Sequence, residues 1–159
     1  MVVREALPAD FPAISRLFEE VDQLHAEAEP GVFQNPTPRG RSQQFLDRKL
    51  EALDVGMFLA EQAGEVIGFA IVRLSSAPDI PVLRPRRFAY LEDIVVAARA
   101  ARHGIGRALM RRVEAWASAQ GADRVELTVW DFNRNAIDFY AALGYRTDYR
   151  WMSRSIKAG

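Results

Sequence analysis

The stretch LEDIVVAARAARHGIGRALMRRVEAWASAQG, residues 91–121, decides the fold that we expect for this chain of 159 residues. It begins as an apolar strand, passes through a turn that contains Gly104 and Gly106, and continues with apolar residues at helical spacing. A glycine turn before a helix aims several backbone N–H groups and the positive end of the helix dipole at one point. A pyrophosphate suits that point, although a plain tight turn gives the same pattern.

Residues before this stretch predict a short strand, two helices and an antiparallel meander. Apolar residues recur at helical spacing after Asp10 and again after Ser42, and both of these residues suit the N-cap of a helix. Strands are expected at residues 2–6, 57–61, 66–74 and 88–96. Residues 29–40 and 75–87 are rich in proline and are expected to be loops.

Residues after this stretch predict a further strand, a helix and a closing segment. The strand is expected at 125–129, the helix over 136–143 with a stop at Gly144, and strand-like residues follow at 145–156. A meander followed by strand–helix–strand crossovers indicates the α+β or mixed α/β class. No repeat or linker divides the chain, so we expect a single domain over residues 1–159.

Composition excludes several classes of protein. The net charge is zero and 49% of the residues are hydrophobic, which is typical of a soluble globular domain without nucleic-acid partners. The absence of cysteine excludes disulfides and a thiolate nucleophile, and it fits a cytoplasmic location. No apolar run is long enough to span a membrane. Two histidines, His25 and His103, do not make a metal site without clustered carboxylates, so we expect no metal.

A second motif lies near the C-terminus, in the sequence NRNAIDFYAALGY of residues 133–145. Taken alone it predicts an amphipathic helix that Asn133 caps and Gly144 ends, with Tyr140 as a core aromatic residue. The Walker and Rossmann phosphate-binding patterns are both absent from the chain. The chemistry therefore depends on residues 91–121 and 133–145 together.

These two segments, at this separation, resemble the GCN5-related N-acetyltransferase (GNAT) superfamily. Residues 91–96 with 103–109 look like its motif A, and residues 133–145 look like its motif B. The resemblance implies a GNAT-like fold with a central mixed sheet of six to seven strands, flanked by about four helices. It also implies acetyl-CoA as cosubstrate, which the following residues would bind: Ile94, Val95, Val96, Arg102, His103, Gly104, Ile105, Gly106, Arg107, Asn133 and Tyr140.

The resemblance implies direct transfer of an acetyl group to a primary amine in a ternary complex. Tyr140 is the expected general acid, which protonates the departing CoA thiolate, unless it only packs or contacts the sulfur. An amine with a pKa of about 10 must lose a proton before it attacks. Glu92 is the expected base, directly or through water, with Asp93 as the alternative if a β-bulge exchanges the two side chains. The competing interpretation is that both acids are only solvated or paired with arginine.

One position departs from the family pattern. Ala101 stands where the family usually has arginine or glutamine. Either Arg99 or Arg102 replaces the lost side chain, or the backbone amides alone suffice to bind the phosphate. This keeps a non-catalytic CoA-binding or regulatory module as the alternative function. The acceptor, a small-molecule or peptide amine, stays open, and the loops at 29–41 and 75–87 are expected to decide it. The oligomeric state stays open, and a homodimer is one possibility that we expect from the family.

Overall fold

The computed structural model describes residues 1–34 and 41–156. The chain divides into two compact units, residues 1–128 and 129–159, and each is described by itself. Part of the loop expected at 29–40, namely residues 35–40, lies outside the described residues. The single domain that the sequence suggests stays a prediction.

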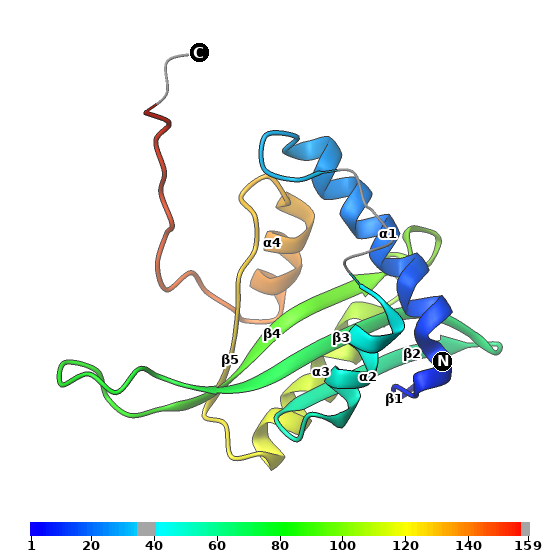
Figure 1. Cartoon of the computed structure of the whole chain (residues 1–159), viewed down its shortest axis with the longest axis horizontal. Coiled ribbons are helices and arrows are strands. Elements are labelled where there is room, and N and C mark those ends of the chain that lie inside the picture. The colour runs from blue at the N-terminus through cyan, green and yellow to red at the C-terminus, as the bar shows by residue number, and fades with distance from the viewer. Residues whose placement is uncertain (35–40, 157–159) are drawn as a thin grey trace. The chain divides into compact units, whose positions relative to one another are not determined.

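The first unit is built on a five-stranded sheet whose strands lie in sequence order, as Figure 1 shows. The strands are β1 (Val2–Glu5), β2 (Val55–Gln62), β3 (Glu65–Ser76), β4 (Arg87–Val96) and β5 (Arg124–Leu127). Neighbours from β1 to β4 are antiparallel, whereas β5 is parallel to β4. The antiparallel meander followed by a crossover is therefore confirmed.

Two helices cover one face of the sheet, α1 (Phe11–Ala28) and α2 (Gln43–Glu51). Ile14, Leu17 and Phe18 are spaced so that α1 has one apolar face, and all three are buried. The ring of Phe18 packs edge-on against Phe69 of β3, with 4.6 Å between the ring centroids. Ser42 caps α2 by accepting a hydrogen bond from the backbone N–H of Phe45, as expected.

The helix of the crossover, α3 (Ile105–Ala119), covers the other face of the sheet (Figure 1). Its apolar side chains at helical spacing, Leu109, Met110 and Val113, are fully buried. A helix between two parallel strands must pack on one face of their sheet, and this helix begins soon after the end of β4. The strand–turn–helix unit at residues 91–121 is thus confirmed.

The sheet has fewer strands than expected. Among the described residues there are five strands, and not the six to seven that the resemblance implied. Residues 145–156, which were expected to close the sheet, have no regular secondary structure, and β5 ends at Leu127. A strand requires a neighbouring strand that satisfies its backbone N–H and C=O groups, and residues 145–156 form no such strand pairing within the described chain.

The second unit contains α4 (Arg134–Ala142), so that the described residues contain four α-helices, in agreement with the expectation of about four. Gly144 follows α4 with a φ of 91°, a left-handed conformation that favours glycine and ends helices. None of the helices in the described part of the chain has the length and apolar character needed to cross a membrane. The cytoplasmic location stays a prediction.

Candidate active site

The central feature of the site is a β-bulge in β4. Asp93 lies opposite Ile71 of β3 and Leu91 lies opposite Val72, so Glu92 is an extra residue without a partner in the register. Ile71 belongs to the core under α1 and α2, and residues directly opposite each other share a face of the sheet. Asp93 therefore faces α1 and α2.

Glu92 lies on the same face, because two cations from that side hold its carboxylate. The Nζ of Lys49 in α2 donates to one carboxylate oxygen, and the Nε of Arg73 in β3 donates to the other at 2.9 Å. Arg73 also pairs with Asp54 at 2.7 Å. Burial alone would raise the pKa of Glu92, but the two hydrogen bonds outweigh it, so this pKa lies below its ordinary value.

Asp93 has a different environment. Its carboxylate makes no hydrogen bond or ion pair with residues 1–34 or 41–156. Burial raises the pKa of Asp93 above its ordinary value, and the charges around it are those of Arg41, Glu92, Lys49 and Asp22. Asp22 of α1 is itself paired with Arg41 at 2.5 Å. Among these acids on the α1–α2 face, Asp93 is the one without a paired cation in the described chain.

Beyond the bulge, β4 has an open edge. Its pairing with β5 ends where Leu91 meets Leu127, although β4 continues to Val96. The predicted cofactor-binding residues Ile94, Val95 and Val96 lie on this continuation, where they pair with β3 on the other side. The backbone groups that they direct away from β3 have no strand partner in the described chain, so they can hydrogen-bond to an amide-containing chain such as pantetheine.

The close pairing of β3 and β4 at this edge depends on a glycine. A Cβ added to Gly68 of β3 would lie 2.8 Å from the backbone oxygen of Val95. Real Cβ atoms do not approach an oxygen so closely, so a side chain at position 68 would push β4 out of place. Gly68 thus fixes the position of the β4 backbone at the residues expected to bind the cofactor.

The turn after β4 presents backbone N–H groups at the start of α3. Gly104 is the N-cap with a φ of 78°, and no side chain caps the helix. The N–H groups of Ile105, Gly106 and Arg107 belong to the first turn and have no acceptor within the helix. His103 at this turn is exposed and its ring hydrogen-bonds to the backbone oxygen of Ala101. The geometry fits an anion such as a pyrophosphate, because free N–H groups and the helix dipole meet there.

Arg102 has an unusual conformation in the same turn. Its φ of 65° is left-handed, which favours glycine and costs other residues about 1–2 kcal/mol. Its side chain is exposed and makes no ion pair among the described residues. Arg99, the other candidate to replace the cation lost at Ala101, is paired with Glu65 at 2.5 Å. Arg102 is therefore the arginine of the two that is available for a phosphate.

The second unit carries the remaining predicted residues. The side-chain oxygen of Asn133 accepts a hydrogen bond from the backbone N–H of Ala136 at 3.1 Å, so Asn133 caps α4. Tyr140 is buried between aromatic neighbours, with its ring 5.2 Å from Phe139 and 5.8 Å from Tyr145. Burial raises the pKa of Tyr140 to about 12, so its phenol is neutral at physiological pH. Its hydroxyl makes no hydrogen bond to a described residue.

Sequence reasoning missed the cations of the α1–α2 face. Lys49 lies among the apolar positions of the helix expected after Ser42, which indicates no catalytic role, and neither Arg41 nor Arg73 carries a local signal of its role. Lys49 and Arg73 reach Glu92 from 43 and 19 positions away in the chain, so only the packing of α2 and β3 on β4 brings them together. Within the described residues, no three histidine, aspartate or glutamate side chains cluster as metal ligands would.

Comparisons of the sequence with known proteins agree on one family of acetyltransferases. The model of the family described as "Acetyltransferase (GNAT) family" matches residues 18–145. The uncharacterized N-acetyltransferase YhfO of Bacillus subtilis is 27% identical over 93% of this chain and 91% of its own length. L-ornithine N5-acetyltransferase NATA1 of Arabidopsis thaliana is 31% identical over 86% of this chain and 62% of its own length.

A solved structure shares the fold. The crystal structure of a mutant of the BH1408 protein from Bacillus halodurans superposes with a TM-score of 0.93 at 23% identity, over 99% of this chain and 100% of that one. At this identity the likeness shows the fold alone. It supports the mixed α+β architecture.

Proposed function

Because this chain belongs to the GNAT family of acetyltransferases, we propose that it transfers an acetyl group directly from acetyl-CoA to a primary amine, with both substrates bound together. Enzymes of this family use acetyl-CoA, and the relatives described above are N-acetyltransferases. The observation that carries the proposal is the open edge of β4 beyond Leu91, which leads directly into the uncapped N-terminus of α3.

The cofactor would lie along this edge and this turn. The backbone groups of residues 94–96 would hydrogen-bond to the pantetheine, as the backbones of adjacent strands do to each other. They would also polarise the acetyl carbonyl. The N–H groups of residues 103–107 would receive the pyrophosphate, with the Arg102 side chain as an added cation. When bound, acetyl-CoA supplies the activated acetyl thioester, and the remaining chemistry is proton transfer by side chains.

We propose Asp93 as the base that takes the proton of the acceptor ammonium, directly or through water. Glu92, the base expected from the sequence, has each of its carboxylate oxygens bonded to a cation, and this lowers its tendency to accept a proton. Asp93 has no such partner among the described residues, and its raised pKa makes it the stronger base of the two. Kinetics of Glu92→Gln and Asp93→Asn distinguish the two residues as candidates for the base.

Tyr140 is proposed as the general acid. A phenol with a pKa of about 12 keeps its proton at neutral pH and can give it to a thiolate, and its hydroxyl is not engaged by a described residue. Asn133 is proposed to assist cofactor binding in addition to capping α4, since one amide oxygen can cap a helix while the amide nitrogen donates elsewhere. These roles of the second unit rest on its motif, residues 133–145.

The acceptor class follows from the charge of the α1–α2 face. Asp93 lies unpaired within the described chain among Asp22, Glu92 and their cations, so a cationic ammonium group would complete the charge balance there. The N5-amine of ornithine, on which NATA1 acts by its name, is such a group. Because this relative acts on a small molecule, we favour a small molecule with a primary amine over a peptide, and we also keep the expectation of a homodimer.

The alternative, a non-catalytic CoA-binding module, rests on Ala101 and would need neither Asp93 nor Tyr140. Titration calorimetry with acetyl-CoA tests whether the turn before α3 binds the cofactor. It compares the affinity of Gly104→Trp with that of Gly121→Trp. Both glycines have a left-handed φ, 78° and 74°, and they stand at opposite ends of α3, so both variants carry the same backbone strain. Only the first places an indole where the phosphate is expected.

We expect saturable binding by the wild type and by Gly121→Trp, and at least about a tenfold weaker affinity for Gly104→Trp. Thiol release on addition of ornithine or related amines then tests catalysis. Binding without thiol release for any primary amine, with protein that circular dichroism shows to be folded, would favour the non-catalytic module. No binding by the wild type would contradict the cofactor site itself.

A further inference from the structure

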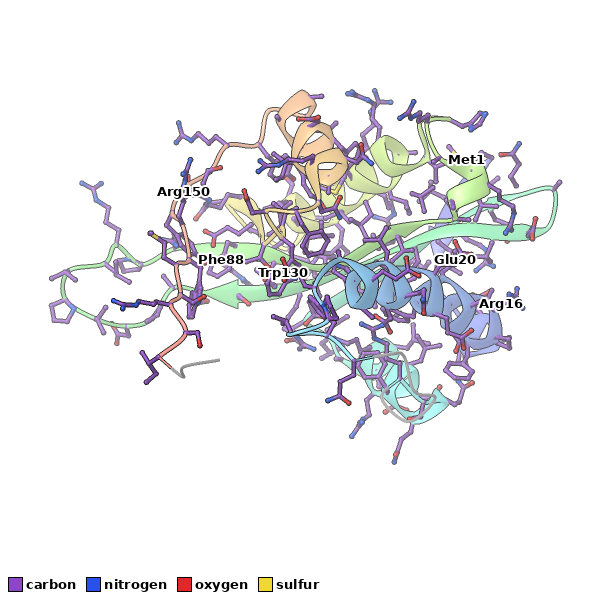
Figure 2. All side chains as sticks on the ribbon, turned by 90° about the horizontal axis from the view of Figure 1, so that it is seen from above. Met1, Arg16, Glu20, Phe88, Trp130 and Arg150 are labelled. Atoms are coloured by element: carbon purple, nitrogen blue, oxygen red, sulfur yellow. The ribbon has the colours of Figure 1, made fainter. Side chains whose placement is uncertain are left out.

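An ion pair on the α1–α2 face has hydrogen-bonding groups that no described residue uses. The Nη1 of Arg41 donates to one carboxylate oxygen of Asp22 at 2.5 Å, and each side chain is 33% exposed. Asp22 belongs to α1, the helix on which Arg16 and Glu20 are labelled in Figure 2. Within the described chain this is the only hydrogen bond that either side chain makes. A guanidinium has five N–H donors and a carboxylate has two oxygens, so the pair can bind a group that brings one anion and one cation.

The ion pair lies on the same face as Asp93. The guanidinium of Arg41 lies over the ring of Phe18, 3.8 Å from its centroid, and Phe18 packs on Phe69 of β3. Phe69 stands two residues before Ile71, whose partner on β4 is Asp93. Since residues two apart on a strand share a face, the stacked rings carry Arg41 to the side that Asp93 faces. The charge of Arg41 also lowers the pKa of Asp93, which agrees with this placement.

The charged side chains around this face leave one negative charge unbalanced. They are four acids and three cations, namely Asp22, Asp54, Glu92 and Asp93 with Arg41, Lys49 and Arg73. An acceptor with a single net positive charge therefore balances the group. A simple diamine is doubly charged at neutral pH, whereas an α-amino acid with a second amine has one net positive charge, because its carboxylate offsets one of its two ammonium groups.

We propose that the pair of Arg41 and Asp22 selects the acceptor, and that this acceptor is an α-amino acid with a primary amine at the end of its side chain. The guanidinium binds the carboxylate, and the free oxygen of Asp22 accepts from the α-ammonium. The side-chain ammonium lies at Asp93, which takes its proton. Arginine recognises a planar carboxylate with paired hydrogen bonds that another end group cannot replace. This inference rests on the proposed acetyl transfer and adds the residues that choose the substrate.

Three amines of equal chain length test each contact separately. L-Ornithine carries both end groups, putrescine lacks the carboxylate, and 5-aminopentanoate lacks the α-ammonium. We expect kcat/KM of the wild type to be about 10- to 100-fold higher with ornithine than with either analogue, because each analogue loses a hydrogen bond between charged groups. A wild type that acetylates putrescine as efficiently as ornithine would overturn this inference and leave the proposed acetyl transfer intact.

Two variants should change this selectivity in a crossed pattern. Arg41→Gln should lose the preference for ornithine over putrescine and keep that over 5-aminopentanoate, whereas Asp22→Asn should do the reverse. Arg112→Gln is the matched control, because Arg112 also pairs with an acid, Glu5 at 3.0 Å, and lies 4.3 Å from the centroid of the Phe58 ring, but belongs to α3. It should keep every wild-type preference. An equal loss with all three amines in Arg41→Gln would indicate a structural role and contradict the proposal.

Binding without turnover distinguishes this inference from the proposed reaction. Titration calorimetry of L-ornithine and of putrescine into the protein, with CoA present, requires no acetyl transfer. Ornithine should bind more tightly than putrescine, and Arg41→Gln should weaken ornithine binding by about tenfold or more. This result supports the recognition even if no thiol is released with acetyl-CoA. If ornithine binds no more tightly than putrescine, the recognition is refuted, whether or not any amine is acetylated.

Discussion

Glu92 and Asp93 are neighbours in the chain, yet both carboxylates lie on the face of the sheet that α1 and α2 cover. A regular strand would place them on opposite faces. The register shift between β3 and β4 makes Glu92 the extra residue of a bulge, and its bonds to Lys49 and Arg73 hold it on the same side as Asp93. Two neighbouring carboxylates thus have different environments: Glu92 is paired with two cations, whereas Asp93 has no paired cation within the described chain.

The first prediction concerns Asp93→Asn and Glu92→Gln. Loss of the proposed base should lower kcat by about 10²–10⁴-fold in Asp93→Asn. The same variant should be more stable than the wild type at neutral pH, because the raised pKa of Asp93 means that its ionised form is unfavourable in the folded state. Thermal unfolding beside steady-state kinetics checks both effects. A purely structural role for Asp93 would not combine lower activity with a higher Tm.

Glu92→Gln should lower the stability of the protein and lower kcat less than Asp93→Asn does. It removes the charge between Lys49 and Arg73, and we expect the free energy of unfolding to fall by about 1–3 kcal/mol. Because the pKa of Glu92 is lowered in the folded state, the stability from this carboxylate is present above its ordinary pKa and disappears as the pH falls through the lowered value. A kcat for Glu92→Gln as low as that of Asp93→Asn would instead support Glu92 as the base.

The second prediction is the pH profile of kcat. If Asp93 must be ionised to accept a proton, kcat falls as the pH falls through its pKa, which lies above that of an ordinary aspartate. The Glu92 charge raises the pKa of Asp93 and the Arg41 charge lowers it. The acid limb should therefore move to lower pH in Glu92→Gln and to higher pH in Arg41→Gln. Shifts in the same direction for both variants would exclude Asp93 as the group that titrates.

The third prediction concerns Arg102→Gly. Glycine adopts the left-handed φ of 65° without strain, so this variant should gain about 1 kcal/mol of stability while its affinity for acetyl-CoA falls. Ala63→Gly is the matched control, because Ala63 has a φ of 52° in the turn between β2 and β3. It should gain stability with unchanged affinity. Calorimetric binding and thermal unfolding distinguish the two, and unchanged affinity in Arg102→Gly would remove the arginine from the proposed phosphate site.

The fourth prediction concerns Tyr140→Phe. Removal of the hydroxyl should lower kcat by about 10²–10⁴-fold with little change in Tm, because that hydroxyl makes no hydrogen bond to a described residue. Tyr90→Phe serves as the control, since the Tyr90 hydroxyl already has a partner in Thr128 at 2.8 Å. The basic limb of the wild-type profile, near the Tyr140 pKa of about 12, should be absent from Tyr140→Phe. Equal kcat values for the two variants would exclude Tyr140 as the acid.

The sequence by itself determined the elements of the first unit and the helix of the second, because these depend on local patterns. Apolar spacing, the caps at Ser42 and Asn133, and the glycines at the ends of α3 and α4 are all read from neighbouring residues, and the structure confirms them. The segment that decides the fold, residues 91–121, does so because strand, turn and helix follow one another without a long loop.

Only the tertiary structure decided which acid is free and how many strands the described sheet has. The bulge that brings Asp93 to the α1–α2 face arises from the register between β3 and β4, which no local pattern encodes. The pairing of Glu92 depends on Lys49 and Arg73, which are distant in the chain. Residues 145–156 have the composition of a strand, but a strand exists only where a neighbouring edge accepts its hydrogen bonds, and these residues pair with no strand of the described chain.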